Sequence, residues 1–159
     1  MKKITVISFI CIIIDQLIKI IVTNNIALNT ELIIIDNFFS LTNVRNDGAA
    51  FSILSGNRIF LICVSLCALI LLYFLFVKDK KLKNIDKIIY GVLLGGIIGN
   101  LIDRVLYGYV IDYLSFNIFG YSFPIFNVAD MAITIGIGLV VLEVAMEEYK
   151  AWKISKSEL

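Results

Sequence analysis

The fold of this chain is decided by one stretch, Gly91 to Asp130, which runs GVLLGGIIGNLIDRVLYGYVIDYLSFNIFGYSFPIFNVAD. It begins in an apolar, glycine-rich segment, passes through an aromatic segment, and ends where a second apolar segment starts. Gly91, Gly95 and Gly99 recur every four residues, and small residues at this spacing let helices approach closely in lipid. The stretch therefore predicts two membrane-spanning helices that meet at one face of a bilayer.

The composition extends this prediction to the whole chain. The 159 residues are 60% hydrophobic, and the mean hydropathy is +0.94, whereas soluble domains are roughly 45–50% apolar. Several apolar runs approach the roughly 20 residues that a helix needs to cross a bilayer. We expect an α-helical membrane protein with one integral membrane domain over residues 1–159. The expected transmembrane helices are residues 4–22, 58–77, 86–107 and 127–146.

The residue types exclude several kinds of site. The chain has no histidine, which excludes a Ser-His-Asp or Cys-His nucleophile system and an H-E-x-x-H zinc site. Cys11, Cys63 and Cys67 lie within apolar runs and are interpreted as small hydrophobic residues in helix packing. The sequence has no basic stripe typical of nucleic-acid binding. We therefore expect no metal, no cofactor and no nucleic-acid partner.

The basic residues predict the orientation in the membrane. Ten of the fourteen fall on one side of the predicted helices: Lys2, Lys3, Lys78, Lys80, Lys81, Lys83, Lys87, Lys150, Lys153 and Lys156. Cytoplasmic segments of membrane proteins carry the excess of Lys and Arg. Both termini are therefore expected in the cytoplasm, with residues 23–56 and 108–123 outside.

The first outer segment has strand and turn signals. Leu32–Ile35 and Phe38–Val44 are rich in strand formers, and Asp36-Asn37 between them favours a turn. We expect a small two-stranded piece lying on the bilayer, followed by a short interfacial helix at Ala49–Leu54. The second outer segment, 108–123, is aromatic-rich and strand-like. Gly108 is expected to end the third helix.

Two carboxylates are predicted to converge at the outer face. Asp112 lies four residues beyond Gly108, and Asp130 lies in the first turn of the fourth helix, which Asn127 is expected to cap. Two carboxyls a few ångströms apart share a proton, so one can accept a proton from water while the other donates to a carbonyl oxygen. The helix N-terminus favours an ionised Asp130 and a protonated Asp112, although such a pair titrates jointly. This chemistry suits peptide hydrolysis.

Other polar residues are expected near this pair. Asn100 and Arg104 are four apart on the third helix and face one way near its outer end, whereas Asp103 points elsewhere and is interpreted as structural. Asp15 and Lys19, in the first helix, have the favourable order for an intrahelical pair. Two interpretations of that pair remain open: Lys19 extends to the outer interface and only neutralises Asp15, or the pair supports the site.

The chain also carries five short motifs: DQLIK (Asp15–Lys19), RNDGAAFS (Arg45–Ser52), GGIIGNLIDR (Gly95–Arg104), VIDY (Val110–Tyr113) and FNVAD (Phe126–Asp130). Their order and spacing resemble those of the lipoprotein signal peptidase family, signal peptidase II. The one departure is Tyr113, where the family often has Phe.

The resemblance implies an aspartic endopeptidase of the bacterial cytoplasmic membrane. It would cleave prolipoproteins just before a cysteine that carries diacylglycerol, and it would act as a monomer in contact with membrane lipid. Asp112 and Asp130 match the catalytic aspartates. The residues that match the polar lining of the site or the first-helix pair are Asn46, Asn100, Arg104, Asn127, Asp15 and Lys19. The outer segments match a small extracytoplasmic β-cradle and an interfacial helix.

Two other classes of protein remain as alternatives. A proton-coupled transporter also places acids in a membrane, but it needs ionisable groups through the full thickness, and the middle of the second and fourth predicted helices has none. A non-enzymatic scaffold leaves the buried Asn, Arg and Asp residues as an unexplained cost. Taken singly, Asp112 is also compatible with a solvated loop acid, and Arg104 with an interfacial anchor.

Overall fold

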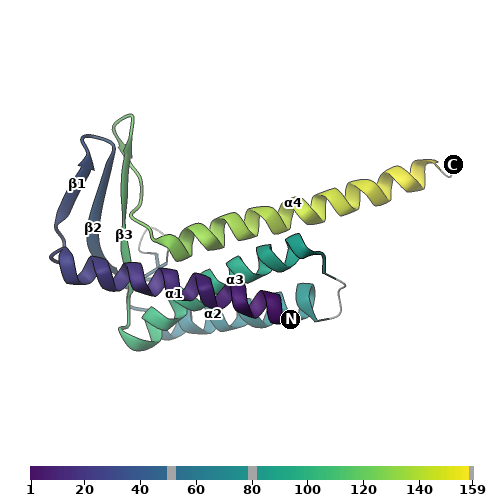
Figure 1. Cartoon of the computed structure of the whole chain (residues 1–159), viewed down its shortest axis with the longest axis horizontal. Coiled ribbons are helices and arrows are strands. Elements are labelled where there is room, and N and C mark those ends of the chain that lie inside the picture. The colour runs from purple at the N-terminus through teal and green to yellow at the C-terminus, as the bar shows by residue number, and fades with distance from the viewer. Residues whose placement is uncertain (50–52, 79–81, 158–159) are drawn as a thin grey trace.

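The structure is a computed structural model that describes residues 1–49, 53–78 and 82–157. Within them, four helices are long and apolar enough to cross a membrane, as the sequence predicted. They are α1 (Lys2–Asn25), α2 (Arg58–Leu72), α3 (Asn84–Leu106) and α4 (Val128–Ser157). A π-helical turn, η2 (Tyr73–Val77), continues α2. Figure 1 shows α4 continuing past the ends of α1 and α3.

α3 lies at the centre of the helix bundle. In an 18-residue apolar stretch of α3, 56% of the residues are buried, compared with 6% in the corresponding stretch of α2. Its glycines make this possible: a Cβ added at Gly95 would lie 2.6 Å from the Cβ of Cys11 in α1. On another side of α3, a Cβ at Gly96 would lie 2.6 Å from the Ala129 carbonyl oxygen of α4. The glycine spacing therefore lets α3 contact two neighbouring helices closely, as expected for small residues in a membrane bundle.

A four-stranded antiparallel sheet crosses one end of the bundle (Figure 1). Its order is β1 (Glu31–Ile35), β2 (Phe39–Asn46), β3 (Val110–Ile118) and β4 (Tyr121–Ser122). The prediction of two strands after the first helix is confirmed. The sequence did not predict that the second outer segment adds β3 directly to β2. Half of the expected interfacial helix at Ala49–Leu54, residues 50–52, lies outside the described residues.

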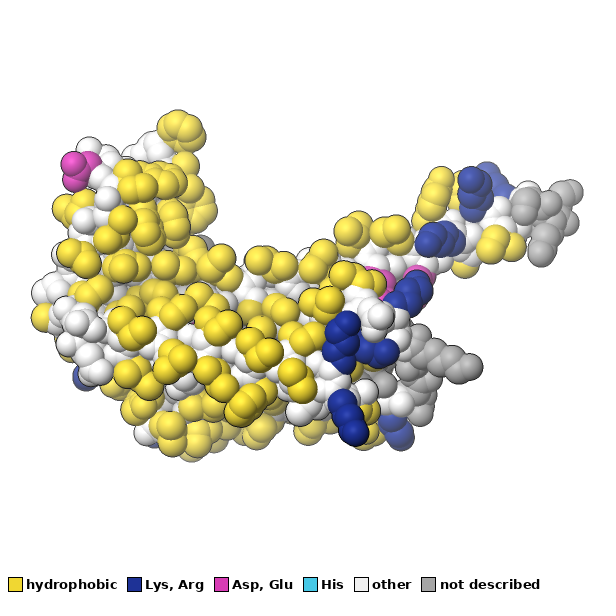
Figure 2. Space-filling view, viewed as in Figure 1, with side chains coloured by type: hydrophobic (Ala, Val, Ile, Leu, Met, Phe, Trp, Pro, Cys, Tyr) yellow, Lys and Arg dark blue, Asp and Glu magenta, His cyan; other side chains and the backbone are white. Residues whose placement is uncertain are grey.

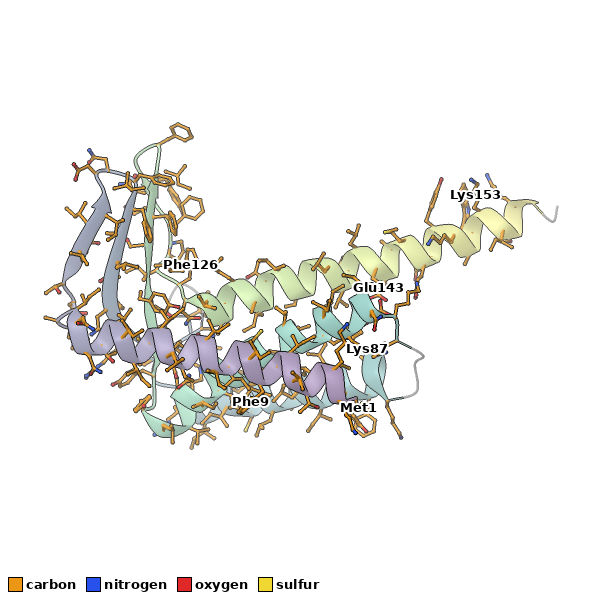
Figure 3. The ribbon with its side chains drawn as sticks, in the orientation of Figure 1. Met1, Phe9, Lys87, Phe126, Glu143 and Lys153 are labelled. Atoms are coloured by element: carbon orange, nitrogen blue, oxygen red, sulfur yellow. The ribbon has the colours of Figure 1, made fainter. Side chains whose placement is uncertain are left out.

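The surface agrees with insertion in lipid. Phe9 of α1, Ile59 of α2 and Leu142 of α4 are 62%, 77% and 55% exposed, which apolar side chains tolerate where lipid replaces water. Most of the visible Lys and Arg side chains gather at the end of the bundle away from the sheet (Figure 2). Met1, Lys87 and Lys153 lie toward that end, whereas Phe126 lies where the sheet meets α4 (Figure 3).

Candidate active site

Asp112 is positioned by the pairing of β3 with β2. α3 ends at Leu106 with Tyr107 as its C-cap, and Gly108 follows with a φ of +89°, a conformation that favours glycine. β3 then starts at Val110, whose register partner is Asn46, while Asp112 pairs with Val44. Residues two apart on a strand share a face, so Asn46 and Asp112 are diagonal neighbours. The Asn46 Nδ2 donates to Asp112 Oδ2 at 2.9 Å.

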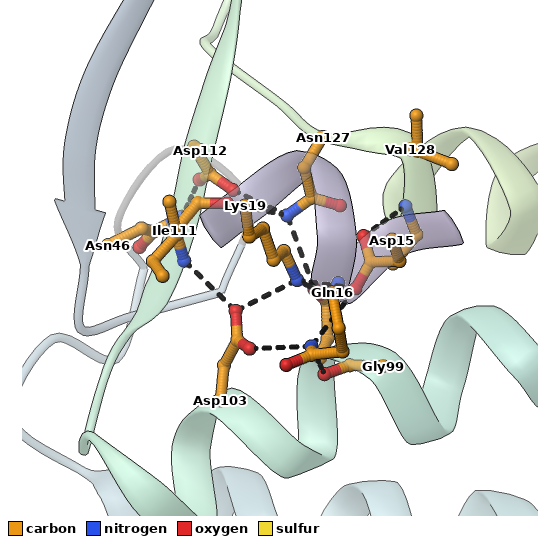
Figure 4. Close-up of polar contacts among 12 residues, drawn as sticks. Asp15, Gln16, Lys19, Asn46, Gly99, Asp103, Ile111, Asp112, Asn127 and Val128 are labelled. Atoms are coloured by element: carbon orange, nitrogen blue, oxygen red, sulfur yellow. Dashed lines mark hydrogen bonds and ion pairs between the residues drawn. The ribbon is translucent and has the colours of Figure 1, made fainter. Parts of the chain in front are cut away.

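Asp130 is positioned by the start of α4. The Asp130 N–H donates to the Oδ1 of Asn127 at 2.9 Å, and the Asn127 N–H donates back to Asp130 Oδ2 at 3.1 Å. This reciprocal arrangement is a capping box with Asp in the place of Glu, and it confirms the predicted cap. The same Asn127 uses its Nδ2 to donate to Asp112 Oδ1 at 2.7 Å. Asn127 therefore bonds to both residues that carry the candidate carboxylates, and Figure 4 shows its bond to Asp112.

α3 supplies two further side chains to this site. Asn100 is buried, and its Nδ2 donates to Asp130 Oδ1 at 2.8 Å. One turn later, the guanidinium of Arg104 donates to the Gly48 carbonyl oxygen at 3.0 Å. The Nε of Arg104 is buried and has no hydrogen-bond partner among the described residues. A buried N–H group without a partner can donate a hydrogen bond to an oxygen of a bound ligand.

Behind the two carboxylates lies a buried ion-pair network. The ammonium of Lys19 contacts Asp15 Oδ2 and Asp103 Oδ2, both at 2.8 Å, and donates to Asn100 Oδ1 at 2.9 Å. Lys19 and Asp15 are each only 1% exposed, so the interpretation that Lys19 extends to the outer interface is wrong. The glycine at position 99 makes room for this network, because a Cβ there would lie 2.7 Å from Asp15 Oδ2.

Asp103 is buried at the centre of that network and connects it to the strand that carries Asp112. Its Oδ2 also accepts the N–H of Ile111 at 3.2 Å, and Ile111 directly precedes Asp112. Its Oδ1 accepts a hydrogen bond from Gln16 at 2.9 Å. These contacts join α1, α3 and β3, which agrees with the structural role predicted for Asp103.

Both candidate carboxylates line a cavity of about 630 Å³. The rest of its lining is largely apolar and includes Phe123, Phe126, Met131 and Ile135. The pKa of Asp112 is raised to about 7: burial is the main cause and the negative charge of Asp130 adds to it, while the hydrogen bonds from Asn46 and Asn127 act in the opposite direction. Asp112 is therefore suited to hold a proton near neutral pH.

Sequence reasoning missed two contributors. Gln16 donates to Asp103, and the Tyr113 hydroxyl accepts the Val128 N–H at 3.2 Å. Burial raises the pKa of Tyr113, so its hydroxyl stays protonated. Gln16 lies three residues before Lys19, on the same side of the helix, and this spacing was the one available signal. The Tyr113 contact depends on where α4 starts in space, which no local pattern gives.

Fold and site together define a multi-pass helical membrane protein with a buried carboxylate pair beside an apolar cavity, under an antiparallel sheet. A family model described as signal peptidase (SPase) II matches residues 7–146. Relatives named lipoprotein signal peptidase, from Staphylococcus aureus strains MRSA252 and JH9, are 40% and 39% identical over 131 residues, which are 82% of this chain and 80% of each relative.

Solved structures are also similar to this chain over most of its length. Two structures described as bacterial membrane enzymes share 36% and 37% sequence identity with this chain, with TM-scores of 0.85 and 0.80. They cover 93% and 91% of this chain, and 90% and 93% of their own chains are matched. The chain belongs to the signal peptidase II family. It is therefore a multi-pass bacterial membrane protein that hydrolyses peptide bonds.

Proposed function

We propose that this membrane peptidase removes signal peptides from bacterial prolipoproteins by an aspartic mechanism, with Asp112 and Asp130 as its catalytic residues. One observation carries the proposal: Asn127 bonds to both of these residues, and both line the same apolar cavity. The name of the Staphylococcus aureus relatives, lipoprotein signal peptidase, supports the substrate class. The absence of histidine from the chain leaves carboxylates as the natural acid and base.

The reaction needs one ionised and one protonated carboxyl. Asp130 takes a proton from water as the water oxygen bonds to the scissile carbonyl carbon, and Asp112 donates its proton to the carbonyl oxygen. The tetrahedral intermediate then loses the C–N bond. The leaving nitrogen takes the proton from Asp130, and the hydroxyl group of the intermediate returns its proton to Asp112. Both carboxyls end in their starting states.

Arg104 is proposed to orient the substrate. Its guanidinium lines the cavity between β3 and α4, and its Nε–H is unused within the described residues. A carbonyl oxygen of the bound peptide would accept from that N–H. Asn46, Asn100 and Asn127 hold the two carboxylates, and Asp15 and Lys19 support Asn100 and the start of α4.

The cavity supports a lipid-modified substrate. Its aromatic and aliphatic lining at the start of α4 suits acyl chains, and its polar end holds the two aspartates. A cysteine that carries diacylglycerol would keep its tails in the bilayer and bring the preceding peptide bond to the carboxylates. We propose cleavage just before that cysteine, on the outer face of the cytoplasmic membrane, by a monomer with both termini in the cytoplasm.

The decisive test is signal-peptide release from a diacylglyceryl-modified prolipoprotein by purified protein in lipid. Asp112→Asn and Asp130→Asn should each abolish release while the protein stays folded and inserted, because asparagine keeps the shape of aspartate but transfers no proton. The matched control is Asp36→Asn on the exposed β1–β2 turn, which should retain full activity. Substantial turnover by either dyad variant would refute the mechanism.

A further inference from the structure

Three asparagine side chains surround the two carboxylates, and each points its amide nitrogen at one of them. Asn46 and Asn127 donate to the two oxygens of Asp112, at 2.9 and 2.7 Å. Asn100 donates to Asp130 Oδ1 at 2.8 Å. An asparagine amide has an oxygen and a nitrogen of similar size, so something must select this orientation in each case.

In all three cases the amide oxygen faces a group that can only donate. The Asn46 Oδ1 accepts the Gly48 N–H at 3.0 Å, and the Asn127 Oδ1 accepts the Asp130 N–H at 2.9 Å. These two donors belong to the backbone. The Asn100 Oδ1 instead accepts from the ammonium of Lys19 at 2.9 Å, and at a longer 3.2 Å from the Nδ2 of Asn127. Among the three amides, only Asn100 is oriented by a charged side chain.

The Lys19 ammonium is fixed in position by contacts with three acceptors. Its ammonium has three hydrogens and no lone pair, and it has three acceptors: Asp15, Asp103 and Asn100. A flipped Asn100 would place its NH₂ against the NH₃⁺ group, with donor facing donor in a buried position. Leaving buried donors unpaired is costly. The ammonium therefore excludes the flipped amide.

We infer that Lys19 is a positioning residue that acts through Asn100: by fixing the amide oxygen, it keeps an N–H donor on Asp130 and so maintains Asp130 as the ionised base. The inference rests on the proposed aspartic mechanism. The charged groups around Asp130 are Arg104 of α3, Lys19 of α1 and Asp112 of β3, with Asp15 and Asp103 behind Lys19. Without Lys19, only the longer contact from the Asn127 Nδ2 remains on the Asn100 oxygen, and Asn100 can rotate to present that oxygen to a protonated Asp130.

The inference predicts a change in the pH dependence of kcat/KM. Loss of the donor favours a protonated Asp130, so the acidic limb of the profile should move to higher pH. A shift of about one pH unit corresponds to a tenfold change in proton affinity. The variant to test is Lys19→Met combined with Asp103→Asn, because it removes one positive and one negative charge together from the buried network. Lys19→Arg, which keeps a donor-only cation, should restore most of the wild-type profile.

Two matched variants test whether Lys19 acts on Asp130 through Asn100. Asp103→Asn alone keeps the ammonium and should not move the acidic limb upward. Asn100→Leu alone removes the same donor and should move it upward as the double variant does. In the Asn100→Leu background, adding Lys19→Met and Asp103→Asn should give little further shift, because both changes remove one interaction. Activity is measured on a diacylglyceryl-modified prolipoprotein, and thermal unfolding checks the folding of each variant.

The inference fails if Asn100→Leu keeps the wild-type acidic limb, whether or not the Lys19 variant folds. It also fails if the Lys19 variant loses activity equally at every pH, which indicates a structural role alone, or if its shift adds fully to that of Asn100→Leu. Failure of the proposed function would look different: the wild-type protein would not release signal peptide, or Asp112→Asn and Asp130→Asn would remain active.

Discussion

At the scale of single residues, Asn127 couples the helix start to the site. Its backbone and Oδ1 close the cap of α4, and its Nδ2 bonds to Asp112. A cap residue is replaceable in an ordinary helix by Ser, Thr or Asp. Here the amide uses two separate atoms, an oxygen that accepts the Asp130 N–H and a nitrogen that donates to the Asp112 carboxylate, whereas a hydroxyl has a single oxygen and a carboxylate has no donor. The requirement for asparagine at this position therefore comes from the site.

The hydrogen bond from Asn46 to Asp112 leads to a prediction on pH dependence. This bond stabilises the ionised carboxylate, so Asn46→Leu should raise the pKa of Asp112 further above about 7. The protonated acid then persists to higher pH, and the alkaline limb of kcat/KM should move upward by about one unit. The control is Asn43→Leu in the same strand. The native Asn43 donates to the Ile26 carbonyl and not to Asp112, so this variant should leave the alkaline limb in place. A limb that stays fixed in Asn46→Leu would contradict the assignment of Asp112 as the acid.

Arg104 and Arg58 provide a contrast between activity and stability. Arg104→Ala should lower kcat/KM by about 10- to 100-fold, because the lost interaction is with substrate, and should change thermal unfolding little. Arg58 is exposed and donates to the Arg104 and Val105 carbonyls at the end of α3. Arg58→Ala should therefore lower stability by about 1 kcal/mol while the folded fraction keeps its specific activity. If Arg104→Ala were fully active, Arg104 would be only an interfacial anchor.

The residues of the site were predictable to different degrees. The positions of Asp112 and Asp130 relative to helix ends follow from local signals, namely Gly108 and the Asn127 cap. The Asp15–Lys19 pair follows from helical spacing. The contacts of Lys19 with Asp103 and Asn100 do not, because they depend on the rotation of α1 against α3. That rotation is set by packing over the whole helix pair.

At the scale of elements, the glycines of α3 determine how closely α1 approaches. Gly95→Ala should destabilise the protein by about 1–3 kcal/mol, because its Cβ would meet Cys11 and the Ser8 carbonyl within 2.9 Å. Since α1 carries Lys19, activity should fall as well. Gly138→Ala in α4 is the matched control, because a Cβ there meets nothing within 4 Å. Thermal unfolding in lipid compares the two, and equal stability of both variants would contradict the role of Gly95.

Two features of the helices and strands were not predicted from sequence patterns: the length of α4 and the pairing of β3 with β2. Apolar runs predicted all four helices, but α4 extends to Ser157 and not to about Met146. The expected range ended at residue 146, although the Glu, Lys and Ala residues that follow Met146 favour helix. The addition of β3 to β2 is a pairing between strands more than sixty residues apart, and hydrophobic alternation carries no information on partners.

At the scale of the whole molecule, the sheet and the basic residues mark opposite ends of the bundle (Figures 1 and 2). α4 has 30 residues and spans about 45 Å at 1.5 Å per residue, more than the roughly 30 Å of a hydrocarbon core. Its last turns, with Lys150, Lys153 and Lys156, therefore extend beyond the core. The excess of lysine at that end predicts that it faces the cytoplasm.

This orientation is testable in intact cells by labelling with a membrane-impermeant thiol reagent. The native Cys11, Cys63 and Cys67 are first replaced by alanine, and single cysteines are then placed at Asn29, beside the sheet, and at Lys153, near the end of α4. Asn29→Cys should label in intact cells, and Lys153→Cys should label only after the membrane is opened. The reverse pattern would place the carboxylate pair on the cytoplasmic side, where a signal peptide already translocated with its lipoprotein could not reach it.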